Sequence, residues 1–206
     1  MTDAVVRIPD ADPHSGSPVA IPRPDFEVVP RAGIPIAASI FAALVVAIIA
    51  NKLWPLVFLH VVFGAAWTIL DLFLGFVLGP IMRRLSVPAR IELTTRLMPR
   101  LLLIMPTVVT VTLAAGWQLG TLMGTVNSSY FLHDWVVASY IVVGCLALIA
   151  LGLIAPANVA VLMELKKPRP NPAVIQTLMK RFMFSAGFTG ALQVAILVIM
   201  TRIRSG

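Results

Sequence analysis

Five apolar runs, each about as long as a membrane-spanning helix, dominate this 206-residue chain. They occupy about residues 33–50, 55–82, 101–119, 134–155 and 182–200, and roughly 20 apolar residues are enough to cross a bilayer. Charged residues make up only 12% of the chain, about half of their share in a soluble domain. Because lipid offers the backbone no hydrogen-bond partners, such runs form helices. The sequence therefore predicts an all-α polytopic transmembrane bundle of about five spans, forming one domain over residues 32–206.

The basic residues predict the orientation of this bundle. The segments 83–100 and 164–181 contain five lysines or arginines each, of sixteen in the chain. Cytoplasmic loops carry an excess of such residues, so both segments and the N-terminus are expected in the cytoplasm. The net charge of +7 is then explained by topology and by contact with anionic lipids. We expect a multi-pass protein of the cytoplasmic (inner) membrane, with the lipid bilayer and not nucleic acid as its partner.

Residues 1–31 differ from the rest of the chain in composition. They are rich in proline and aspartate and contain no apolar block. Such a segment cannot bury enough surface to offset the entropy lost on ordering. The sequence predicts a disordered cytoplasmic tail.

Two polar residues stand out in the second run, LHVVFGAAWTILDLFLGFVLGPIMRRL at residues 59–85. His60 and Asp71 are eleven residues apart, close to three helical turns, so they share one face with Trp67. A charge turned toward lipid costs at least a few kcal/mol. This face is therefore predicted to point into the bundle.

Counting residues from the ends of the runs predicts which side chains lie at the same depth. This count places Asp71 in an inner polar layer with Thr110 and Gln193, and His60 in an outer layer. The expected members of the outer layer, besides His60, are Ala115, Gly116, Ser139, Tyr140 and, just above them, His133.

The outer layer is compatible with a cofactor. A neutral imidazole is a common ligand of haem iron and of copper, and Gly64 and Gly116 would allow a flat macrocycle to approach the helices. The expected cofactor-binding residues are His60, Trp67, Gly116 and Tyr140, with His60 and His133 as metal ligands and Met105 as a weaker choice than His133. Alternatively, His60 hydrogen-bonds Ser139 or Tyr140 and sets the helix register, or takes part in quinone or proton handling.

Asp71 also has two interpretations. Burial without a nearby cation favours the neutral acid, which would simply hydrogen-bond Thr110 or Gln193 across the helices. Alternatively, Asp71 relays protons between the inner side and His60.

The stretch FLHVVFGAAWTILDLFLGFVLGPIMRRL resembles the opening helix of the CopD-like membrane proteins, and also the haem-containing bacterial membrane protoporphyrinogen oxidase family. The following stretch, RLMPRLLLIMPTVVTVTLAAGWQLG, is similar to the next helix of these families. The resemblance covers about residues 55–120 and implies that His60 is a ligand of haem or copper. The chain departs from the pattern in its extra leading span, its single histidine within a span and its lack of an intramembrane lysine. The matching positions are Leu59, His60, Trp67, Gly79, Pro80, Arg83 and Arg84.

The sequence thus leads to three functional hypotheses. The first is a redox or metal-handling membrane protein that binds haem b or copper through His60, with Asp71 assisting proton movement. The second is an accessory subunit without a cofactor, packed against other membrane subunits of a larger complex. The third is a small-solute or ion transporter that uses Asp71.

Overall fold

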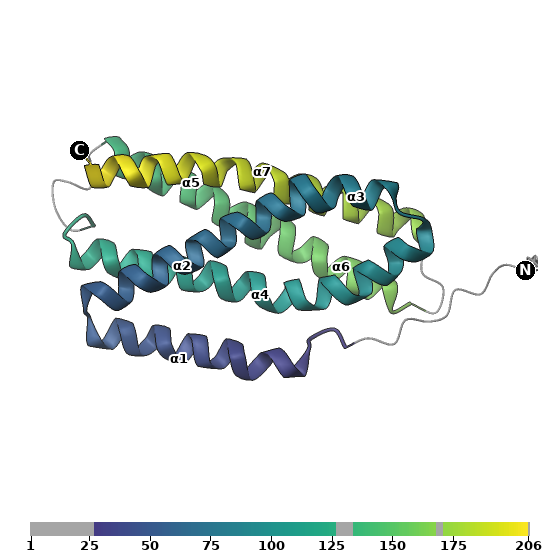
Figure 1. The fold of residues 1–206 in the computed structure, drawn as a ribbon, viewed down its shortest axis with the longest axis horizontal. Helices are drawn as coiled ribbons and strands as arrows, with labels where there is room; N and C mark the ends of the chain where they lie inside the picture. Colours follow the sequence, from purple (N-terminus) through teal and green to yellow (C-terminus); the bar gives the residue numbers. More distant parts are fainter. Residues whose placement is uncertain (1–26, 127–133, 168–170, 206) are drawn as a thin grey trace, which may run out of the picture.

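The computed structural model describes residues 27–126, 134–167 and 171–205. Within these ranges every regular element is helical, and five helices are long and apolar enough to span a membrane. They lie side by side in an elongated bundle (Figure 1). The all-helical class with five candidate spans is therefore confirmed. The tail predicted for residues 1–31 lies outside the described residues as far as residue 26.

The first two spans are joined by a very short connection. A 3-10 turn at Arg31–Gly33 leads into α1 (Ile34–Ala50), and α2 (Leu53–Leu72) begins after two further residues. Asn51 makes the turn in the left-handed conformation, with φ of 47°, which asparagine adopts more readily than most residues. The Asn51 side chain accepts a hydrogen bond of 2.9 Å from Gln118 Nε2, which ties the connection to α4.

The third span is longer than the sequence predicted. The span expected at 101–119 is part of one continuous helix, α4 (Val87–Leu122), which also includes most of the basic segment before it. The helix begins before the apolar run because one of its faces is already buried there: Thr94, Met98 and Leu101 are all buried at spacings of three or four residues. Pro99 and Pro106 lie inside this helix without ending it.

The last two spans also extend beyond their predicted bounds. The fourth consists of α5 (Asp134–Ile149), a π-helical stretch η4 (Ala150–Ile154) and α6 (Ala155–Leu165). The fifth, α7 (Pro172–Ser205), begins ten residues before the predicted start at residue 182. The predicted end of the fourth span coincides with Pro156, which lies in the first turn of α6 and does not end the span. The start of the fifth span was missed because residues 172–181 include polar and basic side chains such as Gln176, Lys180 and Arg181.

Two spans contain π-helical stretches, and each stretch ends just before a proline. The second span continues from α2 through η2 (Phe73–Leu78) into α3 (Gly79–Arg84), with Pro80 after η2, and Pro156 follows η4 in the same way. A proline donates no backbone hydrogen bond, and its ring clashes with the carbonyl one turn back in a regular helix. The wider turns relieve this clash, and their backbone bonds reach back five residues, from Gly79 to Leu74 and from Ala155 to Ala150.

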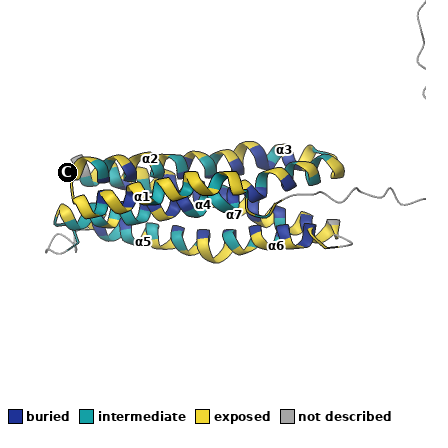
Figure 2. Ribbon diagram, turned by 90° about the horizontal axis from the view of Figure 1, so that it is seen from below, coloured by how far each residue is buried: buried dark blue, intermediate teal, exposed yellow. Residues whose placement is uncertain are grey.

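The packing order places the second span between α4 and α7. Helix α2 packs mainly against α4, and also against α7, while α5 and α6 pack against α7 and α1 packs against α4 and α2. Buried residues face the inside of the bundle, and exposed residues run along its outside over the full length (Figure 2). The exposed residues include many large apolar side chains, as expected for a surface in contact with lipid.

The described parts of the two basic segments, 83–100 and 164–181, lie toward one end of the bundle, which we call the basic end. The starts of α1, α4 and α7 and the ends of α3 and α6 lie there, on the right of Figure 1. The basic end includes Arg83 and Arg84 after η2 and Lys166 and Lys167 after α6. The other end carries far fewer basic residues along the described chain: Lys52 before α2, and Arg202 and Arg204 in the last turns of α7.

Candidate functional site

Asp71, a residue of α2, contacts α7 in the buried middle of the bundle. Only 1% of its surface is exposed. Its Oδ2 atom accepts hydrogen bonds from Thr189 Oγ1 at 2.9 Å and from Gln193 Nε2 at 2.8 Å. Both donors come from one face of α7, four residues apart, and both are buried. The predicted inner polar layer therefore exists and contains Gln193.

The other predicted member of this layer was wrong, and one member was missed. Thr110 is exposed, whereas its neighbours Val109 and Val111 on α4 are buried. Counting depth does not give the direction of a side chain around the helix axis, and α4 turns Thr110 outward. Thr189 could have been found from its spacing of four residues from Gln193, which places both on one helix face.

Glycines bring the backbones of the second span and α7 close together around Asp71. A Cβ atom at Gly190 would lie 3.2 Å from the backbone nitrogen of Leu72 and 3.3 Å from the backbone carbon of Asp71. One turn further along, a Cβ at Gly75 would overlap the backbone of Gly187. This close approach brings the short side chain of Thr189 within reach of the carboxylate.

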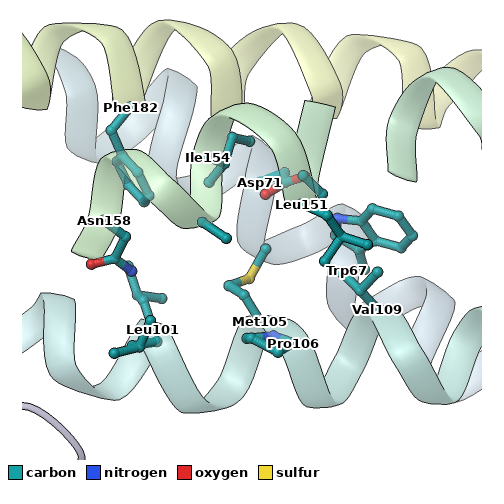
Figure 3. Close-up of a pocket in the computed structure, with 13 residues that line it drawn as sticks. Trp67, Asp71, Leu101, Met105, Pro106, Val109, Leu151, Ile154, Asn158 and Phe182 are labelled. Atoms are coloured by element: carbon teal, nitrogen blue, oxygen red, sulfur yellow. The ribbon is translucent and has the colours of Figure 1, made fainter. Parts of the chain in front are cut away.

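A small cavity lies beside Asp71 (Figure 3). Its volume is about 30 Å³, more than the roughly 10–15 Å³ that one water molecule requires. In the close-up, Asp71 and Trp67 lie toward one end of the cavity and Asn158 toward the other. Asp71 is the single titratable residue among those that line it: Trp67, Asp71, Leu101, Leu102, Met105, Pro106, Val109, Ala150, Leu151, Ile154, Ala155, Asn158 and Phe182.

Polar atoms of the cavity lining have unused hydrogen-bonding capacity. Trp67 Nε1, Asp71 Oδ1 and Asn158 Oδ1 are buried and make no hydrogen bond with any described protein group. Trp67 Nε1 lies close enough to Asp71 to interact with it electrostatically but does not meet hydrogen-bond geometry. Buried polar atoms are almost always paired, with protein or with ordered water. These three atoms are therefore suited to bind a small polar species in the cavity.

One irregular helix segment borders the same cavity, and a second begins close to it. The stretch η2 starts two residues after Asp71, and η4 contributes Ala150, Leu151 and Ile154 to the lining. Pro106 of α4 also lines it and provides no amide hydrogen for the carbonyl of Leu102. Such irregularities are frequent at functional sites, and here they coincide with the one buried carboxylate of the second span.

His60 lies in a separate layer, where α2 contacts α4. Its Nδ1 atom lies 2.9 Å from the backbone oxygen of Thr112. Because a carbonyl oxygen only accepts, Nδ1 carries the hydrogen, and Nε2 is the nitrogen with a lone pair available in the neutral ring. The predicted partners Ser139 and Tyr140 were wrong for this hydrogen bond, since it goes to the main chain of α4.

The imidazole of His60 occupies the space over Gly116. A Cβ atom at Gly116 would lie 2.6 Å from His60 Cε1 and 2.7 Å from Nδ1. At Gly64, a Cβ would meet Thr112 Cγ2 at 3.4 Å. The depth prediction that paired His60 with Gly116 is confirmed. However, the room that we expected these glycines to provide for a macrocycle is filled by protein, so a haem does not fit between them in this packing.

The remaining predicted site residues are placed as follows. Ser139 is buried and donates to the carbonyl of Val136 in its own helix at 2.7 Å. Tyr140 meets Trp117 edge to face, with ring centroids 6.2 Å apart. Met105 lines the cavity beside Asp71 rather than a site at His60. His133 lies outside the described residues.

The two layers are not joined by hydrogen bonds along the described chain. Eleven residues of helix separate His60 from Asp71 by about 16 Å along the axis. The hydroxyl groups of Thr68 and Thr112 donate to carbonyls of their own helices, at 3.0 and 2.8 Å. Nor do any three His, Cys, Asp or Glu side chains of the described residues come together as a metal site. A proton relay from Asp71 to His60 stays a prediction without a direct path.

Comparison with known proteins does not add to this description. No family model, curated protein or solved structure matches the chain. The likeness of residues 55–120 to haem-containing and copper-handling membrane families therefore stays a prediction, and the function is inferred from the geometry alone.

Proposed function

We propose that the chain is a multi-pass membrane protein in which Asp71 binds and releases protons within the bilayer. The basic end lies in the cytoplasm in this proposal, in accordance with the excess of Lys and Arg on cytoplasmic loops. Five apolar helices support the insertion. The function falls in the class of proton-coupled membrane processes, since an ionisable residue inside a span commonly marks an ion or proton pathway.

One observation carries this proposal: the two oxygens of Asp71 have different surroundings. Oδ2 accepts two hydrogen bonds from α7, whereas Oδ1 has no protein donor in the described structure and the residue borders a cavity that can hold water. A carboxyl fixed through one oxygen can gain or lose its proton at the other without turning. Thr189 and Gln193 therefore act as positioning residues for the proton-binding atom.

The surroundings of Asp71 favour exchange toward the basic end. The cavity extends from Asp71 to Asn158 and Phe182. These two residues lie between Asp71 and the basic end, where α6 ends and α7 starts. The amide of Asn158 can hydrogen-bond a water molecule that serves the carboxyl. On the other side, Trp67 and the apolar residues packed against it, among them Val109 and Leu146, close the path toward His60.

Infrared difference spectroscopy of the protein in vesicles, recorded across a change of pH, tests this proposal. The expected result is a carboxyl C=O band that is absent in Asp71→Asn, which preserves size and an acceptor oxygen. The control is Asp134→Asn, which changes an exposed aspartate at the opposite end and should keep the band. Parallel measurements with a pH-sensitive dye inside the vesicles should show slower proton movement in Asp71→Asn alone. An unchanged spectrum and unchanged proton movement in Asp71→Asn would refute the proposal.

A second candidate function is favoured by the tautomer of His60. Ligand histidines usually donate their other ring N–H to a carbonyl or carboxylate, which orients the ring, and the bond to Thr112 has this form. Nε2 would then hold a metal ion such as copper, with a second ligand from residues beyond those described, such as His133. An absorption spectrum of the purified protein that changes in His60→Ala would support this candidate. Colourless, metal-free protein that copurifies with other membrane subunits would instead support an accessory role.

A further inference from the structure

A second, larger hollow lies at the basic end, between the second span and α7. This groove has a volume of about 620 Å³, within the range of pockets that hold ligands of drug size. Gly75, Gly79 and Met82 lie on one side and Met179 and Met183 on the other, and Met82 and Met179, which are buried in the core, form the floor of the groove. Each set follows helical spacing, so the groove runs along one face of each helix.

The groove exists because the two helices diverge from a close crossing. The crossing is at Gly75, where α7 comes so near that a Cβ would overlap the backbone of Gly187. From there toward the basic end, α7 packs closely along η2 but touches α3 at few positions. The groove between the helices therefore lies on the basic-end side of this crossing.

Three cations line this groove: Arg83, Arg90 and Lys180. None of them pairs with a carboxylate of the described residues, whose ion pairs join Arg31 to Glu27, Arg96 to Glu92 and Lys167 to Glu164. Arg90 is fixed in place, because its guanidinium donates to the carbonyls of Met82 at 3.0 Å and Leu85 at 3.1 Å. These three cations form the rim of the groove, and no carboxylate of the described residues neutralises them.

We propose that this groove binds an anionic phospholipid. The phosphate group would lie among Arg83, Arg90 and Lys180, and an acyl chain would follow the glycine and methionine walls toward Gly75. Basic pockets between membrane helices on the cytoplasmic side are suited to anionic headgroups, and methionine side chains adapt to flexible apolar ligands. The continuity of a cationic rim with apolar walls favours a lipid over a soluble anion.

Binding in neutral detergent tests the proposal, because no lipid surface then supplies a general electric field. The full-length protein is titrated with dioleoylphosphatidylglycerol or with dioleoylphosphatidylcholine, and bound lipid is counted by native mass spectrometry. The wild-type protein should prefer the anionic lipid. One exposed ion pair contributes up to about fivefold, so the double variant Arg83→Gln, Lys180→Gln should lose up to about 25-fold in affinity for it.

The matched control is the double variant Arg84→Gln, Arg181→Gln. Both residues are exposed neighbours of the groove cations, do not line the groove and carry the same total charge. This variant should lose less than about twofold, because its side chains do not contact the headgroup and therefore lack the contribution of up to about fivefold expected for one direct ion pair. Equal losses in the two double variants, or no preference of the wild type for the anionic lipid, would overturn the proposal.

Two competitors identify the source of the phosphate group. Glycerol phosphate and short-chain dihexanoylphosphatidylglycerol carry the same anionic chemistry without a full acyl chain. The proposal expects both to compete far more weakly than the dioleoyl lipid. Competition by glycerol phosphate at equal concentration would show a soluble-anion site and would refute the lipid assignment. Unchanged thermal melting of all variants verifies that the comparison concerns binding and not folding.

Discussion

The crossing of the second span and α7 allows an asymmetric prediction about two glycines that touch each other. In Gly75→Ala, the new methyl group would overlap the backbone of Gly187. In Gly187→Ala, the new methyl group would lie 3.5 Å from the Cα of Gly75, which is ordinary van der Waals contact. The same substitution on the two sides of one contact should therefore have different effects.

The expected difference in the free energy of unfolding between these two variants follows from two opposing contributions. Exchanging glycine for alanine inside a helix gains about 1 kcal/mol of helix propensity at either position. Forcing an extra methyl group into a packed contact costs about 1–3 kcal/mol, and only Gly75→Ala bears this cost. The free energy of unfolding of Gly75→Ala should thus lie about 1–3 kcal/mol below that of Gly187→Ala, which corresponds to about 5-fold to 150-fold in the unfolding equilibrium.

Unfolding of the purified variants by a denaturing detergent in mixed micelles measures this difference. Gly144→Ala provides the reference, because a Cβ at Gly144 has no neighbour within 4 Å and the substitution reports helix propensity alone. The infrared band assigned to Asp71 should shift in Gly75→Ala, since displacing α7 lengthens the hydrogen bonds from Thr189 and Gln193. Equal stability of Gly75→Ala and Gly187→Ala would show that the crossing is not as close as the structure indicates.

Two further predictions use the same unfolding measurement. Gly116→Ala should cost about 1–3 kcal/mol, because its Cβ would lie 2.6 Å from His60 Cε1. Combination with His60→Ala should relieve at least about 0.5 kcal/mol of that cost, and strictly additive effects would contradict this contact. Gln193→Leu should cost about 1–3 kcal/mol by removing a buried donor from Asp71, whereas Thr110→Val, at an exposed position, should stay within about 0.5 kcal/mol. Similar losses in these last two variants would refute the inner layer as described.

Depth within the membrane was the most predictable property of the candidate site. A helix rises by a constant 1.5 Å per residue, so counting from the ends of the apolar runs correctly paired His60 with Gly116 and Asp71 with Gln193. The same count failed for Thr110, since it carries no information on rotation about the axis. It also failed for Ser139, because the hydroxyl is used by its own helix and the imidazole is bonded to a main-chain carbonyl, which no side-chain pattern reveals.

The prolines show a second limit of the sequence. Pro80, Pro99, Pro106 and Pro156 all lie within spans, and local preference alone treats each as a probable end or kink. In the structure, Pro80 and Pro156 follow π-helical stretches, whereas Pro99 and Pro106 lie inside the continuous helix α4. The outcome depends on which neighbouring helices are packed against each position, and this packing keeps α4 continuous from Val87 to Leu122.

The amino-acid order is sufficient to establish an all-helical chain with five apolar spans, a basic end and two polar residues on one face of the second span. These properties depend on composition and on spacing within one helix, both of which are local. The partners of those polar residues, the cavity beside Asp71 and the groove at the basic end arise only from tertiary structure. They depend on how closely two backbones approach at glycines that lie far apart in the chain, such as Gly75 and Gly187, and on the rotation of each helix about its axis.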